Sequence, residues 1–251
     1  MSPTCSRDSG QIVTGAQYVQ QITALESDRC ARSAFQNRVL TVAPPGAALL
    51  DFGAGTGMDA RFYAERGFGV SAYDVDPQMR EFFAMHCRDL IDAGRITVHA
   101  GGYRDFIAAK GVGDVDLITS NFAPLNLIED LTELFAKFHA LTRPGGRVLA
   151  SVLSPYFGGD LKYGWWWRNS WRLWSEGHFA VPGAQAPIVR RRLAEFAARS
   201  APYFKLTRVF RGLPPLRERD CGGVDGGSDT LRTAMYLSAC RFMFLLFEKR
   251  P

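Results

Sequence analysis

The feature that most constrains the fold of this chain is a glycine-rich turn between a short strand and a helix. The apolar run 47–50 has the pattern of a buried strand, and Asp51 follows it directly. Glycines then stand at every second position, at Gly53, Gly55 and Gly57. A helical pattern follows from residue 58 and stops at Gly67. In such a turn, glycines let the backbone approach a ligand where a side chain would collide.

The spacing of these glycines argues against a dinucleotide, whose fingerprint is G-x-G-x-x-G. A carboxylate at the strand end would repel phosphate, but it suits a cationic ligand that bears an α-amino group. The stretch resembles motif I of the class I S-adenosylmethionine (SAM) methyltransferases, and it matches at Asp51, Gly53, Gly55 and Gly57. The resemblance implies that these residues bind SAM and that the product is S-adenosylhomocysteine (SAH). The alternative is a tight strand–helix turn without a ligand.

A second strand is expected over 69–73, and Asp74 stands at its end. In a βαβ unit an acid at this point binds ribose hydroxyls, because a carboxylate accepts hydrogen bonds only. Val75 would lie against the adenine, whereas Asp76 and Pro77 are typical of a helix start. The alternative for Asp74 is a solvated strand end.

The next two strands are expected at 96–99 and 114–120, and each is followed by candidate cofactor contacts. The candidates after the first strand are the weaker ones. After the first, the family commonly carries an acid that binds the adenine amine, but this chain has Gly or Tyr there. The predicted adenine contacts are therefore backbone groups and the Tyr103 ring, or Asp105 if the turn is longer. After the second, Asn121 resembles the motif IV residue that lies beside the methionine part of SAM. The [Asp/Asn]-Pro-Pro-aromatic signature is absent, which argues against nucleobase or glutamine amines as substrates.

Strands alternating with helices predict an α/β fold: a doubly wound, seven-stranded, mostly parallel sheet with an antiparallel last strand. Strands five to seven are expected at 147–153, 204–210 and 234–247. The predicted parts are an N-terminal helical cap over 1–45, a SAM-binding core over 46–153, an aromatic insertion after strand five over 154–187, and completion of the core over 188–251. A helix is expected over 188–200, with the arginines 190–192 on its solvated side.

All five tryptophans of the chain lie in the insertion. Trp167, Trp171 and Trp174 are spaced i, i+4 and i+7, as on one face of a helix. Three interpretations stay open: a stripe buried in the core, a lid that walls a substrate pocket, and an interfacial membrane contact favoured by Trp beside Arg. For the lid, the predicted pocket residues are Tyr18, Trp165, Trp167 and Trp171.

A methyl sulfonium needs no activation, so positioning of the acceptor in a dry pocket supplies much of the acceleration. A general base is needed only for a protonated acceptor, and His178 is the candidate; a surface histidine is the alternative. The spacing of Cys and His indicates no metal site.

The composition is that of a soluble protein with a net charge of +5. The five cysteines are scattered and no signal peptide or membrane span is recognisable, so a cytoplasmic location is expected. The predicted function is SAM-dependent O- or N-methylation of a small aromatic or lipophilic metabolite, with no nucleic-acid partner and a homodimer left open. The alternatives are RNA or protein methylation, motivated by the net charge and the arginine run, and a SAM-binding partner protein without chemistry.

Overall fold

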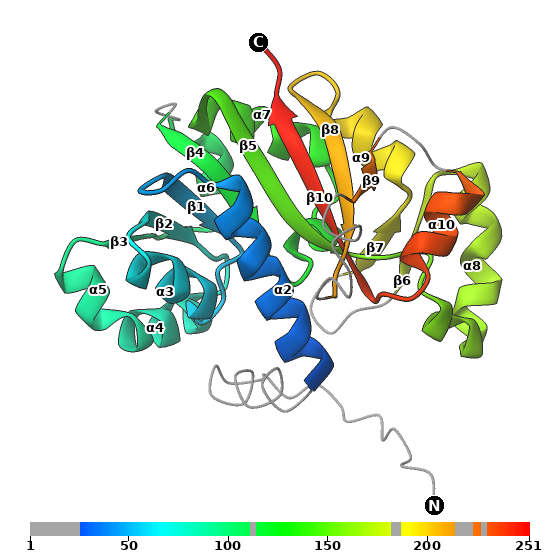
Figure 1. Ribbon diagram of the computed structural model, residues 1–251, viewed down its shortest axis with the longest axis horizontal. Coiled ribbons are helices and arrows are strands. Elements are labelled where there is room, and N and C mark those ends of the chain that lie inside the picture. Colours follow the sequence, from blue (N-terminus) through cyan, green and yellow to red (C-terminus); the bar gives the residue numbers. More distant parts are fainter. Residues whose placement is uncertain (1–25, 111–113, 182–186, 214–222, 227–229) are drawn as a thin grey trace, which may run out of the picture.

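The computed structural model describes residues 26–110, 114–181, 187–213, 223–226 and 230–251, and it is built around one large sheet (Figure 1). The strand order in this sheet is β3-β2-β1-β4-β5-β10-β8-β9. The pairs among β1 to β5 are parallel, whereas β10 runs antiparallel to both of its neighbours. The strands are β1 (Ala48–Phe52), β2 (Gly69–Tyr73), β3 (Ile96–His99), β4 (Val115–Ser120), β5 (Thr142–Leu153), β8 (Phe204–Arg211), β9 (Val224–Asp225) and β10 (Phe242–Lys249).

Helices cover both faces of this sheet, because successive side chains of a strand point to opposite faces. Leu49 of β1 belongs to one apolar cluster and Leu50 to the other. The first cluster includes side chains of α2 (Glu26–Val42), α3 (Met58–Glu65), α4 (Pro77–His86) and α5 (Arg88–Asp92). The second includes side chains of α6 (Tyr103–Ala108), α7 (Leu131–Leu141), α9 (Leu193–Ser200) and α10 (Leu231–Leu237). The doubly wound α/β prediction is confirmed.

Helix α2 packs on the sheet itself. Figure 1 shows it crossing in front of the strands, and the rings of Phe35 and Phe244 meet edge to face at 5.2 Å. Phe35 and Val39 are fully buried. The described part of the predicted N-terminal cap therefore belongs to the core of the fold.

The aromatic insertion consists of the 3-10 turn η2 (Gly158–Lys162), α8 (Gly164–Ser175) and a hairpin of β6 (His178–Val181) and β7 (Ile188–Arg191). The predicted helix over 188–200 is wrong in its first half. Ile188 and Val189 are β-branched residues and pair with β6, and the helix begins only at Leu193.

The arginine run does not form the expected solvated face. Arg190 and Arg191 are 7% and 4% exposed. Arg190 donates to the Ser154 carbonyl at 2.7 Å and forms an ion pair with Asp160 at 3.2 Å. Arg191 donates to the carbonyls of Leu125, Ile128 and Glu129 in the segment after β4. Both side chains are buried because they satisfy loop carbonyls and thereby fix the insertion to the core.

Two other details of the sequence interpretation need correction. The predicted last strand over 234–247 begins only at Phe242; before it lies α10, which the Thr230 hydroxyl caps by accepting the N–H of Thr233. The large sheet has eight strands rather than seven, since the two-residue β9 extends it. Nowhere in the described part of the chain is a helix long and apolar enough to cross a membrane.

Candidate functional site

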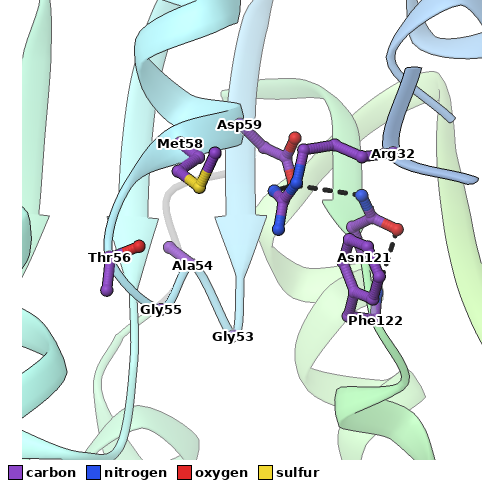
Figure 2. Close-up of a pocket in the computed structure, with 9 residues that line it drawn as sticks. All are labelled: Arg32, Gly53, Ala54, Gly55, Thr56, Met58, Asp59, Asn121 and Phe122. Atoms are coloured by element: carbon purple, nitrogen blue, oxygen red, sulfur yellow. Dashed lines mark hydrogen bonds and ion pairs between the residues drawn. The ribbon is translucent and has the colours of Figure 1, made fainter. Parts of the chain in front are cut away.

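A depression opens at the carboxyl ends of β1 and β4 (Figure 2). It is shallow and open: the surrounding empty space is about 260 Å³ only when open solvent is included. Its lining comes from α2, the glycine turn, the start of α3 and the segment after β4: Arg32, Gly53, Ala54, Gly55, Thr56, Met58, Asp59, Asn121 and Phe122. Ligands of open α/β sheets bind at this edge. Of the predicted cofactor residues, Gly53, Gly55 and Asn121 are part of the lining.

The glycine turn has the shape that the sequence predicts. Gly53, Gly55 and Gly57 all have positive φ, at 75°, 54° and 83°. A Cβ on Gly53 would lie 2.4 Å from Cγ of Pro124, and one on Gly57 would lie 2.8 Å from Sγ of Cys87. Only glycine adopts these backbone angles, and lies this close to neighbouring side chains, without strain. Gly57 therefore serves the packing of the turn and does not line the depression.

Asp74 fixes the turn from the neighbouring strand. Its two carboxylate oxygens accept the N–H groups of Gly55 at 2.7 Å and Asp76 at 2.9 Å. Burial raises the pKa of Asp74, and these two hydrogen bonds oppose the rise. A carboxylate has about four acceptor sites, so Asp74 can still accept from a ligand. Val75, which follows it, is 56% exposed.

Asp51 lies beneath the turn, 2% exposed, rather than in the depression. One of its oxygens accepts the Thr119 hydroxyl at 3.1 Å, and the other has no hydrogen-bond partner within the described ranges. Burial, followed by repulsion from Asp59, raises the pKa of Asp51 to about 8. A buried acid with an unsatisfied oxygen is costly, which is typical of a functional site.

A network of four side chains centres on Asp59, and three of its members line the depression. Asp59, in the first turn of α3, accepts hydrogen bonds from Arg32, from Gln36 at 2.7 Å and from Asn121 at 3.0 Å. Figure 2 shows Arg32 reaching in from α2 toward Asp59 and Asn121. Arg32 and Asp59 form a largely buried ion pair, with 14% and 7% of their side chains exposed. This network joins α2, α3 and the segment after β4 at one point.

Sequence reasoning missed Arg32 and Asp59. Asp59 stands two residues after Gly57, where an acid in the first helical turn has an ordinary structural explanation. Arg32 lies in a helix far upstream, and no local pattern distinguishes it from the other arginines of that helix.

The backbone after β4 is strained. Phe122 and Ala123 have φ of 60° and 70°, which is unusual for residues with a Cβ. Asn121 accepts the N–H of Phe122 at 2.9 Å and so supports this conformation. Strain of this kind gathers at ligand sites, where the surrounding structure enforces it.

The other predicted residues lie outside the lining. Tyr103 packs against the apolar cluster under β1, and its hydroxyl is buried without a hydrogen-bond partner in the described structure. Asp105 caps α6 by accepting the N–H of Gly102 at 2.8 Å. His178 begins β6, with Nδ1 3.2 Å from the Glu176 carbonyl oxygen and 3.9 Å from a carboxylate oxygen of Glu195.

The predicted pocket aromatics also lie outside the lining. Trp165 packs against Phe179, with ring centroids 6.1 Å apart, and Arg190 lies over its ring. Trp167, Trp171 and Trp174 are each about 60% exposed, so the interpretation of a stripe buried in the core is wrong. Tyr18 falls outside the described residues.

A family model described as a methyltransferase domain matches residues 26–186, which is more than half of the chain. The chain belongs to the methyltransferase-domain family. The match begins with α2 and ends within the insertion, before β7, and it includes every residue that lines the depression. The resemblance inferred from motif I is confirmed at the level of the family.

Two curated methyltransferases are similar over a shorter stretch. Malonyl-[acyl-carrier protein] O-methyltransferase of Serratia marcescens is 30% identical over 119 residues, which are 44% of this chain and 40% of the relative. Ubiquinone biosynthesis O-methyltransferase of Xanthomonas axonopodis pv. citri is 28% identical over 111 residues, 44% of this chain and 45% of the relative. The matched stretch thus spans less than half the length of each relative.

Solved structures share the fold over nearly the whole chain. The 1,6-didemethyltoxoflavin-N1-methyltransferase of Burkholderia thailandensis was solved with bound 1,6-didemethyltoxoflavin and SAH. It superposes with a TM-score of 0.61 at 18% identity, and the superposition covers 100% of this chain and 93% of that chain. The geranyl diphosphate C-methyltransferase of Streptomyces coelicolor was solved with Mg²⁺, geranyl diphosphate and SAH. Its TM-score is 0.58 at 14% identity, and the superposition covers 99% of this chain and 90% of that chain. At such identities these likenesses show the fold.

Proposed function

We propose that this protein is a SAM-dependent methyltransferase that acts on a small aromatic or lipophilic metabolite. The observation that carries the proposal is the convergence of Asp74 and Asn121 on the glycine turn, where Arg32 supplies a cation. The two neighbours solved with SAH support this choice of cofactor.

The residues at this edge fit the groups of SAM. Asp74 has acceptor sites left for ribose hydroxyls, and the exposed Val75 beside it offers an apolar contact for adenine. Arg32 suits the carboxylate of the methionine part, because a guanidinium binds carboxylates through paired N–H groups. The buried Asp51 has a pKa of about 8 without a ligand, and in its ionised form it would favour the positive charge of the ammonium and the sulfonium. When bound, SAM supplies an activated methyl group.

The chain's own contribution to the reaction is positioning. Methyl transfer is an in-line displacement, so an acceptor held against the methyl group in a dry site reacts without covalent help from the protein. If the acceptor carries a proton, His178 stays the proposed general base. Its contact with the Glu176 carbonyl assigns the proton to Nδ1, and the neutral Nε2 is then the acceptor.

The proposed substrate class is supported by the names of the similar proteins and by the ligand of one structural neighbour. Both curated relatives are named O-methyltransferases, and one neighbour is solved with a small heterocycle. The RNA or protein alternative loses one of its two motives, since Arg190 and Arg191 are buried. The alternative of a SAM-binding protein without chemistry would be favoured by a pocket that is closed or filled by tryptophans, and the lining among the described residues contains no tryptophan. A cytoplasmic location and a homodimer stay predictions.

Calorimetric titration tests the proposal. SAM and SAH are expected to bind the full chain with one site each, whereas ATP and NAD are expected to give no heat, because the acids at the strand ends repel phosphate. Binding of neither SAM nor SAH would overturn the proposal. Preferential binding of ATP or NAD would replace it with a nucleotide-dependent function.

A further inference from the structure

The outer face of α8 carries a row of exposed tryptophans that the proposed methyl transfer does not use. Trp167, Trp171 and Trp174 follow one face of the helix and are 60%, 61% and 61% exposed. The adjoining Leu161 and Tyr163 are 44% and 45% exposed. We call these five residues the aromatic face. Soluble proteins rarely leave so much contiguous apolar side chain in water unless it binds something.

The helix is amphipathic in the opposite sense to an ordinary surface helix. Its Leu173 is buried and faces the protein, but three of its five tryptophans point outward. The interior supports this arrangement, since Trp165 packs on Phe179 of β6 and Arg190 anchors the hairpin to the core. The indole of Trp167 donates to the Leu161 carbonyl at 2.7 Å, and Arg192 lies 4.8 Å from the ring centre of Trp174. Two of the three exposed indoles, those of Trp167 and Trp174, thus have contacts that hold them in place.

The charges around the aromatic face are predominantly basic. Lys162 and Arg168 are exposed on the same segment. The acids of this region are engaged internally: Glu176 pairs with Arg172 at 3.1 Å, and Asp160 is buried against Arg190. Helices that lie in a membrane interface combine an apolar face that carries Trp with a polar face that carries Lys or Arg. Here Arg168 belongs to α8 and Lys162 to the preceding turn η2. The 12 residues of α8 are far fewer than the ~20 that a spanning helix needs, so the contact would be peripheral.

A second copy of the chain fits this face less well. In a twofold dimer the same surface meets itself, so Lys162 and Arg168 of both copies would gather in one interface. Like charges brought together in this way oppose association. An anionic surface removes this conflict and uses the same cations.

We propose that the aromatic face docks the protein onto anionic lipid membranes. The tryptophan rings enter the boundary between headgroups and acyl chains, and Lys162 and Arg168 contact the anionic headgroups. The face is connected to the cofactor edge, because Arg191 at the end of β7 binds the carbonyls of the segment after β4. Membrane docking would therefore place the site beside a reservoir of lipophilic molecules. The docking itself does not depend on the proposed reaction.

Sedimentation of the full chain with lipid vesicles tests this proposal. Vesicles of phosphatidylcholine mixed with phosphatidylglycerol are expected to bind the protein, and those of phosphatidylcholine alone to bind it at least ~10-fold more weakly. Trp171→Ala is expected to weaken binding to the mixed vesicles by on the order of 10-fold, because a largely exposed indole no longer enters the interface. The double variant Lys162→Glu, Arg168→Glu is expected to weaken binding to the mixed vesicles as strongly as Trp171→Ala does.

The matched control is Met85→Ala, since Met85 is 65% exposed on α4, an element outside the insertion. It is expected to bind vesicles like the unaltered protein. Because the replaced side chains are exposed, each variant is expected to fold. Circular dichroism and thermal melting check this. The proposal is overturned if the unaltered protein binds neither vesicle, or if Met85→Ala and Trp171→Ala have equal effects. A concentration-dependent dimer that Trp171→Ala abolishes would overturn it in favour of a second copy.

Discussion

At the scale of single residues, the site is organised by acids that differ in what they contact. Asp74 accepts two backbone N–H groups, Asp59 accepts three side-chain donors, and Asp51 is buried with one oxygen unsatisfied. Asp74 thereby shapes the turn, and Asp59 holds Arg32 in place. Asp51 supplies negative potential below the turn when it is ionised. These separate environments give three similar side chains three separate roles.

Arg32 is predicted to discriminate ligands by their carboxylate. Replacing it with Gln keeps a donor for Asp59 but removes the charge, so the ion pair is lost without leaving Asp59 unbonded. Arg32→Gln is expected to lower affinity for SAH about 10-fold or more, because a charge-assisted hydrogen bond is worth roughly 1.5–3 kcal/mol. Methylthioadenosine has the nucleoside but no carboxylate, and its affinity is expected to stay unchanged. Calorimetry with both ligands measures the ratio; an equal loss for both would contradict the role.

Asp51 is predicted to make stability depend on pH. Its pKa is raised from 3.8 to about 8 in the folded protein, so between these values the folded state retains a proton that the unfolded state releases. The free energy of unfolding therefore falls as pH rises through this window, by up to about 1.4 kcal/mol per pH unit from this group. Asp51→Asn removes the titrating group and is expected to flatten the profile. Denaturant unfolding of both proteins at several pH values checks this, and parallel profiles would contradict it.

At the scale of elements, the insertion is fixed to the core by buried polar side chains. Asn126 in the turn η1 (Pro124–Leu127) is fully buried. Its amide donates to the Val189 carbonyl at 2.6 Å and accepts the N–H of Leu153 at 3.0 Å. One side chain therefore connects the segment after β4 to β5 and β7. Together with Arg190 and Arg191, it links the aromatic insertion to the cofactor edge.

Replacing Asn126 with Ala is predicted to loosen this connection. Two buried backbone groups would lose their partners, at a cost of about 1–3 kcal/mol each. The expected result is a loss of roughly 2–6 kcal/mol in the free energy of unfolding, with faster hydrogen exchange at the β6–β7 hairpin than at β1 and β4. Exchange followed by mass spectrometry compares these segments. Uniform acceleration over the whole chain would show that Asn126 stabilises the fold in general and does not act on the hairpin in particular.

The elements that sequence reasoning located correctly are those with strong local signals. The unit from β1 to α3 was predicted because glycine spacing and an apolar run are local properties, and Asp76 with Pro77 correctly marked the start of α4. The start of α9 was missed, because Arg190 and Arg191 look like a solvated helix face until their partners in a distant loop are known. The placement of the exposed tryptophans stayed open for a similar reason. Periodicity groups residues on one helix face, but it does not say whether that face points to the core or to solvent.

At the scale of the whole molecule, the sheet gathers groups that are distant in sequence. Arg32, Gly53 and Asn121 belong to three separate segments, yet they line one depression because β1 and β4 are neighbours in the strand order. The parallel arrangement puts the tip of β2, and hence Asp74, at the same edge. The family motifs, each at the end of a predicted strand, correctly indicated that the binding residues gather at this edge. The contribution of α2 could not be predicted, since it depends on how a helix packs across the finished sheet.

The central claim is that Asp74, at the tip of β2, holds the ribose of a SAM molecule seated on the glycine turn. Calorimetric titration with SAH of the unaltered protein and of Asp74→Ala tests it most directly. The account predicts one binding site in the unaltered protein and a dissociation constant at least ~10-fold higher in the variant, because a carboxylate that accepts from ribose hydroxyls is lost. Equal dissociation constants in two folded proteins would contradict the role of Asp74, and the absence of heat in both would contradict the cofactor itself.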